Sequence, residues 1–376
     1  SPFRAPGGVP GGARELFWII ALGFFVRLFA CQYTDVINPD GANYIHQARA
    51  IHYGLWQAVN ACSLTYLSIV PICTAGLYPL FGDWIQAATA VSLLFGTATL
   101  APLYGLAREF FDRPVASLVT LIFAVTPVFI DGSVDIVRDP ACWFFLTSAL
   151  YFLTRKEAGR VATVLGSVCM LLAVWTRVES FVFYLVTLAF LGVRKRGGRG
   201  MHLVLFLTPP VVLVALAVLG AWWFDLSGVY GARLSEIPVR LARALDGYRT
   251  VSANLTGLIL QPPDGIPADF FDHVRDIFWF VGFGVLLQNA LEAYYYPFFL
   301  IFLLGWRGIG KRIRTDGRVA FFVALILAAF ALLYLFVYID WQMDNRWLAP
   351  MVLSSFPIMG FGVERVLSFL RGRCRM

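Results

Sequence analysis

Two aspartates stand at the starts of apolar segments, where a carboxylate can stabilise a helix or act on a substrate. Asp40 directly precedes residues whose apolar side chains recur at helical spacing. One interpretation is a helix N-cap, which would contribute about 1 kcal/mol. The other is a general base, because partial desolvation at the edge of an apolar helix raises a carboxyl pKa toward the range in which it accepts a proton. Asp139, which precedes Pro140, allows the same two interpretations.

Four further charged residues could bind an anion such as a phosphate or lie beside one. Arg346 is the only basic residue in a short segment expected outside the membrane, so it is a candidate for a phosphate at headgroup level; snorkelling to lipid headgroups is the alternative. Arg177 and Glu179 lie in a charged break between apolar runs, where they either pair with each other or act on a substrate. Arg138, beside Asp139, is a third candidate arginine.

The cysteines and histidines show no metal-binding spacing. The six cysteines include no CxxC pair, and the four histidines include no HxxxH pair. We therefore predict no cofactor and no metal site, while a divalent metal held by other ligands stays open.

The composition is that of a membrane protein. Of the 376 residues, 59% are hydrophobic and only 14% are charged, whereas soluble domains carry about 25% charged residues. The 16% of residues that are aromatic fit Trp and Tyr at membrane interfaces. A soluble cytosolic enzyme and a disordered chain are therefore excluded.

The net charge of +7 would suit nucleic acid as well as a membrane, so the positions of the basic residues decide. They cluster in short runs between apolar stretches, which is the positive-inside pattern of cytoplasmic loops. This pattern excludes nucleic acid as a partner and places both termini in the cytoplasm. The runs are Arg194, Lys195, Arg196 and Arg199; Arg307, Lys311, Arg312, Arg314 and Arg318; and Arg371, Arg373 and Arg375.

Apolar stretches between these runs must position the charged residues. We predict an all-α integral membrane protein, a bundle of about nine to eleven transmembrane helices with external juxtamembrane helices. Residues 64–82, interrupted by prolines and a glycine, are expected to be re-entrant or to lie on the outer interface. Residues 161–192 are expected to form a hairpin of two short helices that turns at 176–180. The expected spans are residues 15–34, 84–107, 114–131, 140–153, 203–223, 278–304, 319–338 and 347–368.

The chain divides into four expected regions. Residues 1–14 are a flexible N-terminus. Residues 15–223 form an N-terminal membrane module that holds the catalytic residues and includes an outer loop at 35–63. The polar residues 224–277 form an external loop with short helices, and residues 278–376 supply the C-terminal membrane helices.

The order of these motifs resembles the polytopic membrane glycosyltransferases of the GT-C type, in particular the branch of protein O-mannosyltransferases and the lipid A aminoarabinose transferase. The motifs are PDGANYIHQARAI in the first outer loop, VRDP at the next outer turn, LLAVWTRVES in the hairpin and NRWLAP late in the chain. The resemblance covers residues 15–200 well and the remainder weakly. In one departure, the mannosyltransferase pattern has a second acid directly after the first, and this chain has Gly41 there. This favours the wider bacterial family over protein mannosylation.

The resemblance implies a multi-pass enzyme of the bacterial inner membrane whose active site faces the periplasm. It implies transfer of a sugar from a polyprenyl-phosphate carrier to a hydroxyl of a glycan, lipid or protein, with inversion at the anomeric carbon. Membrane lipid and the other members of a membrane complex are further candidate partners. The implied site residues are Asp40 and Asp139 for catalysis, Arg346, Arg177 and Arg138 for the donor phosphate, and Asn43, Tyr44 and Glu179 for substrate binding.

Two other functions stay open on the sequence alone. A transporter or flippase of a lipid-linked sugar needs polar residues in the middle of several spans. The middles of 84–107, 203–221 and 319–336 contain no acidic or basic residue, which argues against transport. A non-catalytic membrane subunit would use the same fold to hold a partner.

Overall fold

A computed structural model describes residues 11–34, 38–59, 61, 66–156, 159–193, 199–224, 232–341 and 343–373, and these residues form helices and the turns between them. The predicted all-α class is confirmed. The first half comprises α1 (Gly11–Cys31), α2 (Pro39–His52), the 3₁₀ turn η1 (Trp56–Ala58), α3 (Ile69–Phe81), α4 (Trp84–Ala98), α5 (Leu100–Arg108), α6 (Arg113–Val125), α7 (Pro127–Val134), α8 (Asp139–Thr154), α9 (Arg160–Thr176), the 3₁₀ turn η2 (Val178–Ser180), α10 (Phe181–Val193) and α11 (Arg199–Phe224). The second half comprises α13 (Ala232–Leu260), α14 (Ala268–Tyr294), α15 (Tyr296–Gly305), α16 (Ile309–Thr315), α17 (Gly317–Asp340), α18 (Asn345–Ser354) and α19 (Phe356–Arg373).

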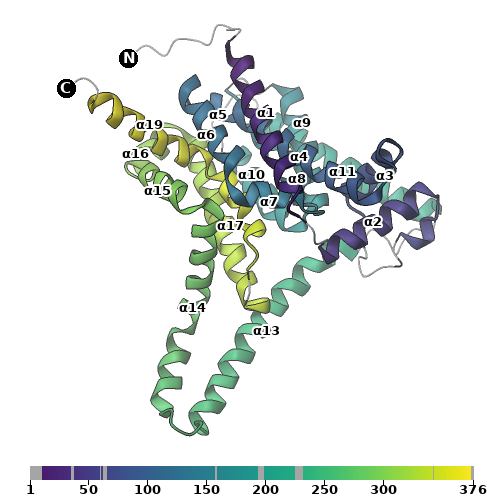
Figure 1. The fold of residues 1–376 in the computed structure, drawn as a ribbon. Helices are drawn as coiled ribbons and strands as arrows, with labels where there is room; N and C mark the ends of the chain where they lie inside the picture. Colours follow the sequence, from purple (N-terminus) through teal and green to yellow (C-terminus); the bar gives the residue numbers. More distant parts are fainter. Residues whose placement is uncertain are drawn as a thin grey trace.

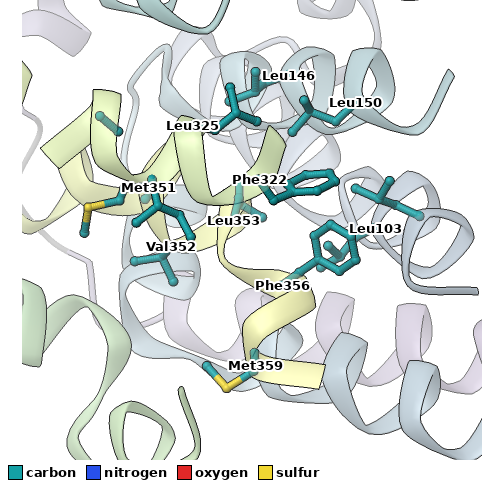
Figure 2. Packing of buried hydrophobic residues seen from close by; sticks show 14 of the residues in the cluster. Leu103, Leu146, Leu150, Phe322, Leu325, Met351, Val352, Leu353, Phe356 and Met359 are labelled. Carbon is teal, nitrogen blue, oxygen red and sulfur yellow. The ribbon is translucent and has the colours of Figure 1, made fainter. Parts of the chain in front are cut away.

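One apolar core unites the two halves of the chain. Leu103 of α5 and Leu146 of α8 are buried in the same cluster as Phe322 of α17 and Phe356 of α19 (Figure 2). The rings of Phe322 and Phe356 lie 4.8 Å apart between centroids in an edge-to-face arrangement. The late helices therefore pack into the N-terminal module instead of forming a separate domain.

Basic turns meet at one end of the bundle. The Glu109 carboxylate after α5 lies 4.0 Å from both Arg155 Nε and Arg318 Nη1. Arg113 Nε, at the start of α6, lies 2.7 Å from a Glu15 carboxylate oxygen near the start of α1. The end of α19 lies at this end too (Figure 1). These contacts bring Arg113, Arg155 and Arg318 to one end of the bundle, which the positive-inside rule predicts to be cytoplasmic. The predicted basic residues at 194–196 lie outside the described residues.

Fewer helices than expected are long enough to cross a membrane. Within the described residues, three helical stretches are long and apolar enough, namely Trp84–Arg108, which α4 and α5 form together, Ala268–Tyr294 and Gly317–Ile339. Two bent pairs, α6 with α7 at 52° and α18 with α19 at 68°, raise the number to five. The predicted nine to eleven spans are not reached by this measure, because several apolar stretches form helices shorter than the about 20 residues that a span needs.

One expected span and the expected start of the first helix differ from the structure. The expected span 278–304 is broken at Tyr295, whose φ of 62° ends α14 one residue before α15 begins. Pro297 lies in the first turn of α15, where a proline can start a helix but cannot continue one. At the N-terminus α1 begins at Gly11, so 11–14 belong to the first helix; residues 1–10 lie outside the described residues.

The prediction of short helices in residues 224–277 is also wrong. Residues 232–260 form the single 29-residue helix α13, which turns at 261–267 into the 27-residue helix α14. The hairpin of α13 and α14 projects beyond the bundle, away from the end of α19 (Figure 1). Apolar and charged residues alternate along α13 at helical spacing, and the missing side chain of Gly247 lets α13 approach the Tyr338 backbone of α17.

Three other local predictions are tested by the helix boundaries. The first outer loop contains the expected amphipathic helix, α2, with Tyr44, Gln47 and Ala48 on its buried face. The predicted hairpin at 161–192 is confirmed as α9 and α10 around η2. Within 64–82 the helix α3 has 13 residues, so at about 20 Å it is too short to span a membrane.

Candidate active site

A buried ion pair joins α8 to the turn between α9 and α10. Arg177 pairs through Nη1 with the carboxylate of Asp139, and their side chains are only 7% and 4% exposed. Arg177 Nε also lies 3.5 Å from Glu179 Oε2 in η2. The N-cap of α8 is Arg138, so the N-cap interpretation of Asp139 is wrong. Asp139 is a buried partner of Arg177 and not an open carboxylate.

Arg240 of α13 completes this charge cluster. Its Nη1 lies 2.5 Å from Glu179 Oε1, so Glu179 bridges two arginines. Burial alone would raise the pKa of Glu179, but the surrounding guanidinium groups hold it well below its usual range. Arg240 was not among the predicted site residues. It lies 61 residues from Glu179 in a helix with several arginines, and nothing in the sequence distinguishes it from the others.

A second polar chain links Arg138 to the first outer helix. Arg138 Nη1 donates to the hydroxyl of Tyr66, and its guanidinium carbon lies 4.9 Å from the centroid of that ring. The hydroxyls of Tyr66 and Tyr44 share a hydrogen bond, and Tyr44 is 1% exposed. Asp40 lies one helical turn before Tyr44 on α2. The structure thus links Tyr44 with Arg138 and places Asp40 one turn away on the same helix; Tyr66 is a further residue that the sequence analysis missed.

Asp40 is not the N-cap of α2. The cap is Asn38, whose side-chain oxygen accepts from the Asp40 backbone N–H at 2.9 Å. The Asp40 carboxylate is half-buried, and it makes no hydrogen bond or ion pair with any residue that the structure describes. Because the capping role is filled by Asn38, this carboxylate is available to a substrate.

Gly41 explains the departure from the mannosyltransferase pattern. A Cβ atom at this position would lie 2.9 Å from Ile136 Cβ and 3.1 Å from the Ile136 carbonyl oxygen. Next to it, Asn38 Nδ2 donates to Asp135 Oδ2 at 3.2 Å. Helix α2 therefore lies so close to the α7–α8 connection, residues 135–138, that no side chain fits at position 41.

Two predicted site residues, Arg346 and Asn43, make no contact with the charge cluster among the contacts of the described residues. Arg346 Nε lies 2.7 Å from Asp344 Oδ2, so this guanidinium has a carboxylate partner, and its predicted role at a phosphate stays a prediction. The neighbouring ring of Trp347 faces Arg177, with the guanidinium carbon 5.9 Å from a ring centroid. Asn43 Nδ2 donates to the Pro39 carbonyl at 3.3 Å within α2, and no contact brings it to the arginines among the described residues.

Two largely apolar cavities lie along the seam between α10 and α17. The first cavity, about 260 Å³, is lined by Glu179 and Arg240 together with apolar side chains of α10, α13 and α17. A second cavity on the same seam, about 720 Å³, lies between residues 186–193 and residues 316–324 toward the basic end. A long apolar chain with an anionic head fits this arrangement chemically.

The described residues contain no group of three or more Cys, His, Asp or Glu side chains that could hold a metal ion. The prediction that the protein needs no cofactor stays a prediction. The chemistry available in the described site is that of one open carboxylate, one linked pair of tyrosines and three arginines that face two buried carboxylates.

Comparison with known proteins agrees with this architecture. The model of the family described as dolichyl-phosphate-mannose-protein mannosyltransferase matches residues 69–223, so this part of the chain is similar to that family's domain. No curated protein matches the sequence. The predicted resemblance to GT-C glycosyltransferases is confirmed.

Solved structures of GT-C membrane enzymes share the fold of nearly the whole chain. The oligosaccharyltransferase AglB of Archaeoglobus fulgidus, solved with an inhibitory peptide and a dolichol-phosphate, is 13% identical with a TM-score of 0.60, over 97% of this chain and 51% of AglB. ArnT of Cupriavidus metallidurans in the apo state is 18% identical with a TM-score of 0.58, over 93% of this chain and 59% of ArnT. The chain therefore has the GT-C fold and spans about half the length of AglB.

Proposed function

We propose that the protein transfers a sugar from a polyprenyl-phosphate donor to an acceptor hydroxyl at the outer, periplasmic face of the bacterial inner membrane. The observation that carries the proposal is the open carboxylate of Asp40, which lies one helical turn from Tyr44, and Tyr44 is linked through Tyr66 to Arg138. AglB, of the same fold, was solved with a dolichol-phosphate, which supports a lipid phosphate as the donor head.

The arginine cluster suits the donor phosphate. Arg177 pairs with Asp139, Arg240 pairs with Glu179, and Arg138 donates to the Tyr66 hydroxyl. These three guanidinium groups outnumber the two paired carboxylates, so the cluster keeps a net positive charge. Arg177 is held between Asp139 and Glu179, which leaves Arg138 and Arg240 as the better placed phosphate ligands. The apolar seam between α10 and α17 would take the isoprenoid chain. Arg346, paired with Asp344, stays a candidate for the same phosphate.

The proposed reaction is a displacement at the anomeric carbon. Asp40 accepts the proton of the acceptor hydroxyl while the oxygen of that hydroxyl bonds to the anomeric carbon. The bond between that carbon and the phosphate oxygen breaks, and the electron pair leaves with the polyprenyl phosphate, whose charge the arginines stabilise. Attack opposite the leaving phosphate inverts the anomeric configuration. Asp40 supplies the base and the arginines supply the charge stabilisation, so the proposed reaction uses no cofactor.

Asp40→Asn tests the proposal. We expect transfer from a panel of polyprenyl-phosphate sugars, mannose included, to fall by about 10²- to 10⁴-fold, the usual contribution of a general base. Transfer is measured as the amount of radiolabelled sugar that detergent-purified protein moves from the donor to the acceptor. Asp83→Asn is the matched control, because Asp83 caps α4 and asparagine caps equally well. Full turnover in Asp40→Asn would remove this carboxylate from the mechanism.

Arg138→Gln tests the donor end of the site. We expect its KM for the donor to rise about tenfold to a hundredfold, since a hydrogen bond to a charged group contributes about 1.5–3 kcal/mol. Arg49→Gln is the control, because Arg49 is an exposed arginine near the end of α2. An unchanged donor KM in Arg138→Gln would place the phosphate elsewhere.

A further inference from the structure

Arg27 is a buried cation in the C-terminal half of α1. Its exposure is 1%, and it makes no ion pair with any residue in the described ranges. A charge inside a membrane helix is unfavourable unless other groups stabilise it, and such residues usually serve a function. Nothing in the proposed reaction uses Arg27, so its contacts must explain why it is there.

The guanidinium group of Arg27 bridges the break between α6 and α7. Its Nη1 donates to the carbonyl of Ala124 in the last turn of α6 at 3.1 Å and to the carbonyl of Gly23 in α1 at 2.9 Å. Its Nε donates to Ser133 Oγ of α7 at 3.1 Å. The two helices bend by 52° at this break. Carbonyls in the last turn of a helix lack intrahelical partners and carry partial negative charge, so they stabilise a cation in place of a carboxylate.

Close packing fixes this contact against α4. A Cβ atom on Gly96 would lie 2.7 Å from Ser133 Cβ and 3.6 Å from Arg27 Nε. One turn earlier on α4, Ser92 Oγ donates to the Val137 carbonyl at 3.3 Å. Helix α4 therefore contacts α7 at Ser133 and the connection that follows it at Val137, and little space remains for either to shift.

Helix α7 leads directly into the α7–α8 connection. That connection receives α2 through Asn38 and Gly41, and it continues into Arg138 and Asp139. The carboxylate of Asp40 and the guanidinium of Arg138 thus depend on one short segment, whose base is held by Arg27.

We propose that Arg27 is a positioning residue: by capping the end of α6 and binding Ser133 it sets the direction of α7, and with it the spacing between the Asp40 carboxylate and the arginine cluster. The inference rests on the proposed function for its kinetic consequence. Its structural consequence, a fixed α7 and α7–α8 connection, is independent of any reaction.

Four variants test it. Arg27→Gln removes the cation, and Ser133→Ala removes one hydrogen-bond acceptor. Arg27→Lys keeps the charge, but an ammonium group lacks the planar donors with which the guanidinium binds the two carbonyls and Ser133 together. Arg14→Gln makes the same change at an exposed position of α1 and is the control. Hydrogen–deuterium exchange is followed in peptides that cover 127–139 and 38–44, and transfer is measured as kcat and donor KM.

We expect Arg27→Gln to raise exchange in both peptides and to lower kcat about tenfold to a hundredfold, because a misplacement near 1 Å has an effect of that size. Donor KM should stay within about threefold, since Arg27 touches no substrate. Arg27→Lys and Ser133→Ala should be intermediate, and Arg14→Gln should match the wild type. Wild-type exchange in Arg27→Gln, or full rescue by Arg27→Lys, would overturn the inference. A wild-type protein without transfer would count against the proposed function alone, because the exchange result would still decide the role of Arg27.

Discussion

Replacing Arg177 with methionine is expected to destabilise the protein by about 3–5 kcal/mol, the usual effect of removing one partner of a buried ion pair. Arg177 is the shared partner of Asp139 and Glu179, and all three side chains are at most 13% exposed. Glu179 keeps Arg240 in the variant, whereas Asp139 loses its only ion-pair partner among the described residues. The midpoint and free energy of unfolding in detergent micelles measure the effect.

A second substitution separates the unpaired charge from lost packing. Arg177→Met combined with Asp139→Asn should regain part of the lost stability, because the asparagine carries no charge that needs a partner. Arg155→Met is the matched control: its ion pair with Glu109 spans 4.0 Å and Arg155 is 41% exposed, so we expect an effect of at most about 1 kcal/mol. If Arg177→Met unfolded with the same free energy as Arg155→Met, the buried pair would not hold α8 to the α9–α10 turn.

The sequence predicts which residues belong to the site more fully than it predicts the contacts between them. Asp139, Arg177 and Glu179 can be chosen from sequence because charges beside apolar stretches are unfavourable without a role. The pairing of Arg177 with Glu179 is one of the interpretations that the sequence allows. The pairing of Arg177 with Asp139 could not be predicted, since 38 residues separate them and only the packing of α8 on α9 brings them together. Whether an aspartate before a helix is its cap depends on where the helix starts, and α2 starts one residue before Asp40.

The helices were harder to predict where proline or charge interrupts an apolar pattern. A mean hydropathy treats residues 114–131 and residues 347–368 each as one continuous apolar stretch. The chain nevertheless bends at Thr126, directly before Pro127, and at Ser355, two residues before Pro357. Conversely, the charges along α13 made a helix of 29 residues hard to predict. This helix is stabilised by packing against α17, which the sequence pattern does not show. Arg240 could not be assigned to the site without this helix.

Gly41→Asp would give this chain the second acid of the mannosyltransferase pattern, and we expect it to lower transfer about a hundredfold or more. The new side chain would begin within 3.1 Å of the Ile136 Cβ and carbonyl oxygen. These atoms belong to the α7–α8 connection, which α4 holds at Val137, so α2 has to move instead. A second negative charge would also be buried near Asp135, whose carboxylate already accepts from Asn38.

Gly41→Ala distinguishes volume from charge, because it adds the same Cβ atom without a carboxylate. If the close approach of α2 is what matters, Gly41→Ala should already lose most of the activity that Gly41→Asp loses, with both proteins still folded. Gly76→Ala is the control: Gly76 lies inside α3, and a Cβ atom there would meet nothing within 4 Å. Transfer and unfolding midpoint are measured for all three variants. Wild-type turnover in Gly41→Ala would show that α2 does not need to lie against Ile136, and the pattern's second acid would then be absent for a reason other than space.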